Sequence, residues 1–152
     1  MKDIENILRR LLKVIKRRRF RNLKFAIVSN NCWGGEVYEK YSKEYNTPFI
    51  GLFLKAPDYI RLVENFNYYI NQEIIFFDNV NVDYPVGKLD DIEIYFMHYE
   101  NQAIAKEKWD RRMKRFIKFS NDYPDKVFFK MCDREDGNLD ILNRFHKTDH
   151  KN

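Results

Sequence analysis

Apolar residues recur along this chain with two different periods, and together they predict strands alternating with helices. Short apolar runs typical of buried strands occupy residues 24–28, 49–54, 73–77 and 126–131. Two further runs, 84–88 and 92–97, flank Leu89-Asp90-Asp91 and predict a hairpin. Pro85 cannot donate to a strand ladder, so we expect the first arm of this hairpin to lie at a sheet edge.

Apolar residues at helical spacing predict four helices in the same part of the chain, over residues 36–44, 57–71, 102–119 and 138–145. In the longest of them, the buried stripe is expected to consist of Ala105, Trp109, Met113 and Phe116. Strands alternating with helices are typical of an α/β fold. We therefore expect a single three-layer domain, with a mainly parallel or mixed sheet covered by helices on both faces.

The first 22 residues predict a basic amphipathic helix, in which an apolar stripe faces away from most Lys and Arg residues: Ile4, Ile7, Leu8, Leu11 and Ile15. Residues 1–24 carry ten Lys or Arg against two carboxylates, a charge of +8; since the whole chain carries +5, residues 25–152 carry −3. We divide the chain into this helix, 1–22, and an α/β domain, 23–152.

Three interpretations of the basic helix stay open. It packs its stripe on the domain with its charges solvated, or it lies on an anionic membrane surface, or it binds nucleic acid. Nucleic acid is the least favoured partner, because no nucleic-acid motif follows in the chain. No apolar run approaches the roughly 18 residues that span a bilayer, so we expect a cytoplasmic location, with the helix allowing peripheral attachment to the inner membrane face.

A polar, glycine-containing loop follows the strand predicted at 24–28 and precedes a helix, which is where α/β proteins commonly bind ligands. We predict that it binds substrate through Ser29, Asn30, Asn31, Trp33, Gly34 and Gly35. The loop matches neither the GxGxxG nor the GxxxxGK[ST] pattern, so it does not indicate a nucleotide. Trp33 either stacks on a sugar or base or belongs to the core, and Cys32 is either a thiolate near a helix start or an inert buried thiol.

Three residues with catalytic side chains, Cys32, His98 and Asp133, each follow the predicted end of a strand. Together they could form a Cys-His-Asp arrangement, in which His98 accepts the thiol proton and Asp133 orients His98. Alternatively His98 is a structural residue, or acts alone as a base toward a sugar hydroxyl. We expect Asn31, Cys32, His98 and Asp133 to share one pocket if the protein is an enzyme, and to be scattered if it is a scaffold.

The acidic segment 133–137 contains Asp133, Glu135 and Asp136. Carboxylate oxygens suit Mg²⁺ or Mn²⁺, so Asp133 and Asp136 are candidate metal ligands; alternatively Asp136 caps the following helix. Arg111 and Arg112 either hold a phosphate or belong to a solvated helix face.

Several of these segments also resemble an uncharacterised bacterial family labelled exopolysaccharide or capsular polysaccharide biosynthesis protein. They are the loop SNNCWGG at 29–35, YNTPFIGLF at 45–53, YPVG at 84–87, HY at 98–99, KW at 108–109 with RR at 111–112, and DR at 133–134 through Gly137. The resemblance covers roughly residues 20 to 146. It implies an α/β fold and a link with cell-surface glycan assembly, but no particular reaction.

From this resemblance we expect a transferase that acts on an activated sugar, such as a sugar nucleotide, or on a lipid-linked sugar. The alternative is a non-catalytic glycan-binding or scaffold partner of a membrane polysaccharide synthase. Family members usually continue beyond the segment matching residues 143–152 into another strand and a tail. We therefore expect the domain to lack a C-terminal strand found in the family.

Overall fold

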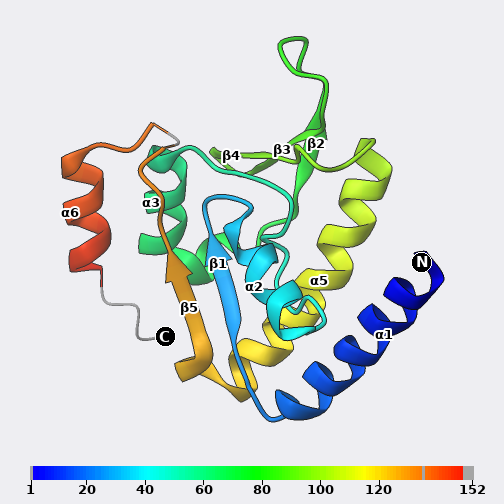
Figure 1. Cartoon of the computed structure of the whole chain (residues 1–152). Helices are drawn as coiled ribbons and strands as arrows, with labels where there is room; N and C mark the ends of the chain where they lie inside the picture. The colour runs from blue at the N-terminus through cyan, green and yellow to red at the C-terminus, as the bar shows by residue number, and fades with distance from the viewer. Residues whose placement is uncertain (1, 135, 149–152) are drawn as a thin grey trace.

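The computed structural model describes residues 2–134 and 136–148, apart from the side chains of Lys2, Asp3 and Arg9, and shows an α/β protein (Figure 1). The elements are, in chain order, α1 Lys2–Arg19, β1 Ala26–Ser29, α2 Trp33–Tyr41, α3 Ala56–Glu64, α4 Phe66–Tyr69, β2 Ile75–Phe77, β3 Val86–Leu89, β4 Ile92–Tyr95, α5 Gln102–Asp122, the short 3₁₀ turn Pro124–Lys126, β5 Val127–Lys130 and α6 Leu139–Lys147. The α/β class is confirmed. The expected alternation is incomplete, because α2, α3 and α4 follow one another with no strand between them in the described structure.

The strands form two small sheets. β1 runs parallel to β5, and β2, β3 and β4 form an antiparallel sheet in that order, which confirms the predicted hairpin. β3 is the central strand, so the expected edge position is wrong. Pro85 lies just before the strand, where its missing N–H interrupts nothing, and its carbonyl accepts a hydrogen bond from Phe96 N at 2.9 Å.

The segment 49–54, predicted as a strand, connects the two sheets instead. Gly51 has φ +70°, which ends any extended run. Beyond it, the main-chain N–H and C=O groups of Phe53 exchange hydrogen bonds of 2.9 Å with Tyr95 of β4, while Leu54 N donates to Asn30 O at 3.0 Å. The segment is buried because it bridges the sheets, and this burial explains its apolar sequence.

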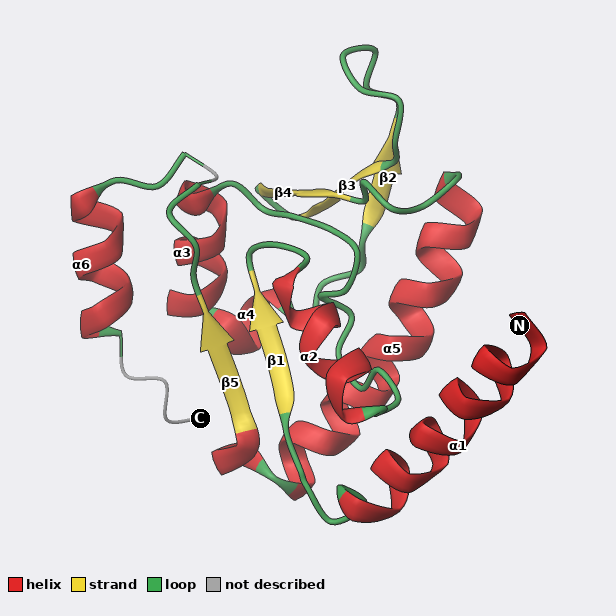
Figure 2. Ribbon diagram, viewed as in Figure 1, coloured by secondary structure: helices red, strands yellow, loops and turns green. Residues whose placement is uncertain are grey.

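Helices cover both faces of the parallel pair (Figure 2). Ala26 and Val28 of β1 belong to the main core with α3 and α5, whereas Ile27 packs with Tyr38 of α2 on the opposite face. The predicted stripe of α5 is confirmed, since all four of its residues are buried in the main core.

Two helix predictions need correction. The helix expected over 57–71 is interrupted at Asn65, whose backbone (φ −125°, ψ 43°) separates α3 from α4. The cap of α6 is Asn138, whose side chain accepts a hydrogen bond from Ile141 N at 2.9 Å, and not Asp136. Asp136 instead lies in the left-handed region at φ 60° and pairs with Lys55 at 3.8 Å.

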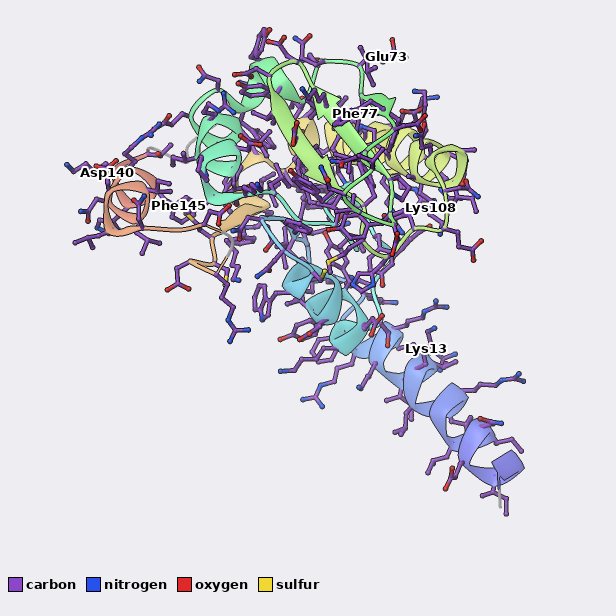
Figure 3. The ribbon with its side chains drawn as sticks, turned by 90° about the horizontal axis from the view of Figure 1, so that it is seen from above. Lys13, Glu73, Phe77, Lys108, Asp140 and Phe145 are labelled. Carbon is purple, nitrogen blue, oxygen red and sulfur yellow. The ribbon has the colours of Figure 1, made fainter. Side chains whose placement is uncertain are left out.

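Helix α1 extends away from the body of the protein, as the position of Lys13 in Figure 3 shows. The described side chains from Ile4 to Arg19 are all exposed, so the interpretation in which α1 packs its apolar stripe on the domain is wrong. None of the helices in the described part of the chain is long and apolar enough to cross a membrane.

Candidate functional site

A cavity of about 300 Å³ lies where the loop before α2, the bridging segment and α5 meet; we call it the inner pocket. Its position follows from the fold, because the segments after β1 and β4 both approach α5 here. It is lined by Cys32, Gly35, Glu36, Glu39, Tyr45, Ile50, Gly51, His98, Tyr99, Lys108 and Arg112.

Arg112 gives the inner pocket its most unusual group. Its side chain points inward from α5 and is only 9% exposed. Nη1 donates to the Tyr99 hydroxyl at 2.6 Å, and the guanidinium carbon lies 4.9 Å from the centre of the Tyr45 ring. Among the described residues, no carboxylate lies within ion-pair distance of Arg112, although Glu36 and Glu39 line the same cavity. The buried guanidinium therefore faces the cavity without a direct ion-pair partner.

Lys108 adds a second cation to the same pocket, one helical turn before Arg112. Its ammonium lies 5.2 Å from the centre of the Tyr99 ring; Figure 3 shows Lys108 on α5. Lys108 belongs to the KW segment of the family resemblance, but it was not among the predicted site residues. The usable signal was its spacing of four residues from Arg112, which places both side chains on one side of the helix.

Tyr99 orients Arg112. Its hydroxyl accepts from Arg112 and donates to Ile50 O at 2.6 Å. Burial raises the pKa of Tyr99, and the positive charge of Arg112 opposes that rise. A phenol that stays protonated keeps its hydroxyl hydrogen on Ile50 O, so its oxygen remains an acceptor for the guanidinium.

Cys32 and His98 both line the inner pocket. The Cys32 sulfur lies 3.5 Å from the Met97 sulfur and 3.8 Å from Leu52 O. His98 is exposed, and its main-chain N–H donates to Gly51 O at 3.2 Å. This arrangement places a thiol and an imidazole on the wall of the cavity that Arg112 and Lys108 also line.

Asp133 lies in a neighbouring hollow of about 580 Å³, the outer pocket, which also contains Asn31. Cys32 and Glu36 line both pockets. In the part of the chain that the structure describes, no hydrogen bond joins the His98 imidazole to Asp133, so the expected Cys-His-Asp triad is not assembled. The four residues thus meet around Cys32 but do not share one cavity.

Ser29 and Asn30 are corrected from substrate-binding to structural residues, because both are fully buried. The Asn30 side chain donates to Cys132 O and accepts from Cys132 N, both at 2.8 Å, and so joins the ends of β1 and β5. The side-chain oxygen of Asn31 accepts from the Ser29 hydroxyl at 3.1 Å and from Trp33 N at 3.2 Å. These polar side chains close the loop on itself.

The remaining loop residues differ in their surroundings. Trp33 is 44% exposed, with the Lys130 ammonium 5.4 Å from its ring centre, so it is not a core residue. Gly34 is needed for packing, because an added Cβ would lie 3.3 Å from Ile27 Cγ2. Gly35 lines the inner pocket, where a small residue leaves space for a ligand.

The two arginines of the pair have different surroundings. Arg111 is exposed and pairs with Glu107 at 3.1 Å on the same helix, whereas Arg112 is buried in the pocket. Arg112 is therefore retained as a candidate anion-binding residue, and Arg111 belongs to the solvated face.

The acidic turn has no complete metal site in the described residues, which contain no group of three or more His, Cys, Asp or Glu side chains able to hold a metal ion. Glu135 lies outside the described residues. A Mg²⁺ or Mn²⁺ ion at Asp133 and Asp136 stays a prediction.

Comparison with known proteins places the chain in a family. The model of a domain of unknown function, DUF1919, matches residues 3–152. An uncharacterized protein of Haemophilus influenzae is 36% identical over 118 residues, which are 78% of this chain and 54% of the relative. The chain thus spans about half the length of that relative.

Proposed function

This chain belongs to the DUF1919 family, and we propose that it is a sugar transferase of exopolysaccharide or capsular polysaccharide assembly that binds the phosphate of an activated sugar in the inner pocket. The observation that carries this proposal is the buried charge of Arg112, which faces the cavity without a carboxylate partner. Leaving a buried cation unpaired is costly, and a ligand phosphate removes that cost.

The two cations of the inner pocket suit a phosphate in different ways. The planar guanidinium of Arg112 can form two parallel hydrogen bonds with phosphate oxygens, while Lys108 acts as a mobile point charge. A volume of about 300 Å³ is at the small end of ligand sites, so it fits a sugar with its adjoining phosphate better than a whole sugar nucleotide.

His98 is the proposed base of the transfer. As the acceptor hydroxyl oxygen bonds to the anomeric carbon, its proton moves to the imidazole, and the phosphate leaves with the electron pair of the broken bond. Arg112 and Lys108 stabilise the charge that develops on the leaving phosphate. Glu36 and Glu39 are exposed on the pocket wall, where their carboxylates accept hydrogen bonds from sugar hydroxyls.

The second candidate is a non-catalytic glycan-binding or scaffold partner of a membrane polysaccharide synthase. It is favoured by the separation of His98 from Asp133, since these residues line different cavities. The same Arg112 site then binds the anionic ligand without transferring it.

The test compares Arg112→Gln with its neighbour Arg111→Gln by calorimetric titration against a panel of nucleoside diphosphate sugars. Arg112→Gln is expected to weaken binding by about 10- to 100-fold, the usual effect of losing hydrogen bonds to a charged group. Arg111→Gln removes the same charge from the exposed face and should change the affinity by less than about twofold.

A third variant, His98→Gln, separates the two candidates. If the protein is a transferase, the wild type releases nucleoside diphosphate, and the His98→Gln variant stops releasing it while keeping its affinity for the nucleoside diphosphate sugar. If the protein is a binding module, neither the wild type nor the variant shows turnover. If no member of the panel binds, or if both arginine variants weaken binding equally, the phosphate site is refuted.

A further inference from the structure

Helix α1 carries an apolar stripe that nothing in the described structure covers. Seven large side chains on it are between 48% and 72% exposed: Ile4, Ile7, Leu8, Leu11, Leu12, Val14 and Ile15. An exposed apolar patch of this kind is unusual for a soluble surface and marks an interaction site. A single helix of 18 residues is also only marginally stable in water without such a contact.

The rest of the helix surface is positively charged. Lys13, Lys16 and Arg17 lie opposite the stripe, and Arg18 and Arg19 follow at the end of the helix. All five are exposed, and none of them takes part in an ion pair among the described residues. The three that lie opposite the stripe line a hollow that Glu39 and Glu44 of the body also line. The partner of α1 must therefore accept apolar side chains on a helix whose net charge is strongly positive.

A second copy of this chain meets only half of that requirement. The apolar hollow beside β5, of about 750 Å³, could receive a helix, but its polar lining includes Lys24, Lys126 and Lys130 and no carboxylate. The helix of another copy would bring like charges to it, which opposes binding.

We propose that α1 lies along an anionic bilayer surface, with its apolar stripe at the boundary of headgroups and acyl chains and its Lys and Arg side chains among the lipid phosphates. The body of the protein remains attached at the C-terminal end of the helix. There the Phe20 and Tyr41 rings lie 4.9 Å apart, and Lys43 Nζ donates to Arg21 O at 3.2 Å. The inference rests on α1 alone and is independent of the ligand of the inner pocket.

The experiment measures co-sedimentation of the full chain with two kinds of vesicle. The neutral vesicles are pure phosphatidylcholine, and in the anionic vesicles about one lipid in three is phosphatidylglycerol. The wild type should bind the anionic vesicles at low salt, bind the neutral ones much more weakly, and dissociate as salt screens the charges. The triple variant Leu8→Gln, Leu11→Gln, Ile15→Gln keeps every charge and should lose at least about 30-fold in partitioning.

Two charge variants complete the test. Lys13→Gln with Arg17→Gln should weaken binding by about 25-fold, or about fivefold for each cation near the surface. Lys114→Gln with Lys118→Gln removes the same charge from exposed positions on α5 and should change binding by less than about twofold.

Three results would overturn the proposal. They are the absence of wild-type binding to anionic vesicles at low salt, equal binding to neutral vesicles, and concentration-dependent self-association that the triple variant abolishes. The last result, read by light scattering, would assign the stripe to a second copy. Unchanged melting of the body in every variant confirms that the substitutions act on α1 alone.

Discussion

Replacing Asn30, in the loop 29–35, distinguishes two roles of this residue. The sequence predicts that it binds substrate, whereas the structure shows it holding two chain segments together. As a substrate ligand, Asn30 would affect binding and leave stability unchanged. In the fold its side chain is fully buried and makes two hydrogen bonds of 2.8 Å to the main chain of Cys132. We therefore expect Asn30→Ala to act on stability.

The size of the effect follows from these two bonds. Asn30→Ala leaves the Cys132 N–H and C=O without partners at the point where β1 and β5 end, and each unsatisfied buried polar group costs about 1–3 kcal/mol. Cys132 is only half-buried, so water partly replaces the lost partners and the total falls below the sum for two fully buried groups. We expect a loss of about 2–4 kcal/mol, a large fraction of the roughly 5–15 kcal/mol that stabilises a typical domain.

Asn30→Asp provides a nearly isosteric control with a predictable sign. The ionised carboxylate of this variant still accepts from Cys132 N, but it has no hydrogen to donate to Cys132 O, so the variant should be at least as destabilised at pH 7. When the carboxyl group is protonated, it regains a donor. The free energy of unfolding of the variant should therefore approach that of the wild type, compared at the same pH, as the pH falls.

The assay is urea unfolding followed by tryptophan fluorescence, combined with ligand titration of the folded protein. A loss below about 1 kcal/mol for Asn30→Ala, accompanied by weaker ligand binding, would refute the structural role and restore Asn30 to the binding site.

Two further changes test the packing around the site. Burial raises the pKa of Tyr59 well above its usual range, so the stability that its neutral phenol contributes is present below about pH 10 and is lost as the pH rises and the unfolded phenol ionises. Tyr59→Phe should lower the free energy of unfolding by about 1 kcal/mol at pH 7, because it removes one hydrogen bond to β1. The variant should also lose less stability than the wild type as the pH rises above about 10, as measured by urea midpoints at increasing pH. An equal loss of stability with pH in the two proteins would contradict this. Gly51→Ala should lower the free energy of unfolding by about 1–2 kcal/mol, since Gly51 has φ +70° and the added Cβ would lie 3.3 Å from both His98 and Tyr99 side chains. Gly35→Ala, whose Cβ has its nearest contact at 3.7 Å, is the matched control, and equal losses in the two variants would exclude backbone strain as the cause.

The sequence by itself determined the elements whose signal is local. Helix α5 and its buried stripe follow from apolar residues at helical spacing within one segment. The β3–β4 hairpin follows from two apolar runs separated by a short polar turn. The amphipathic character of α1 also follows from spacing alone, because the two faces of a helix are defined by residues three and four positions apart.

The tertiary structure decided which polar residues reach the candidate site. Arg111 and Arg112 are indistinguishable by residue type, yet only Arg112 meets Tyr99 and the cavity, because the direction of each side chain depends on how α5 packs against the rest of the core. Asn30 is a further example, since the segment it holds lies 102 residues away in the chain. The periodicity of a segment indicates whether its side chains are buried. The groups that meet inside the fold, however, come from segments distant in the chain. Only their packing determines which polar side chains support the structure and which remain available to a ligand.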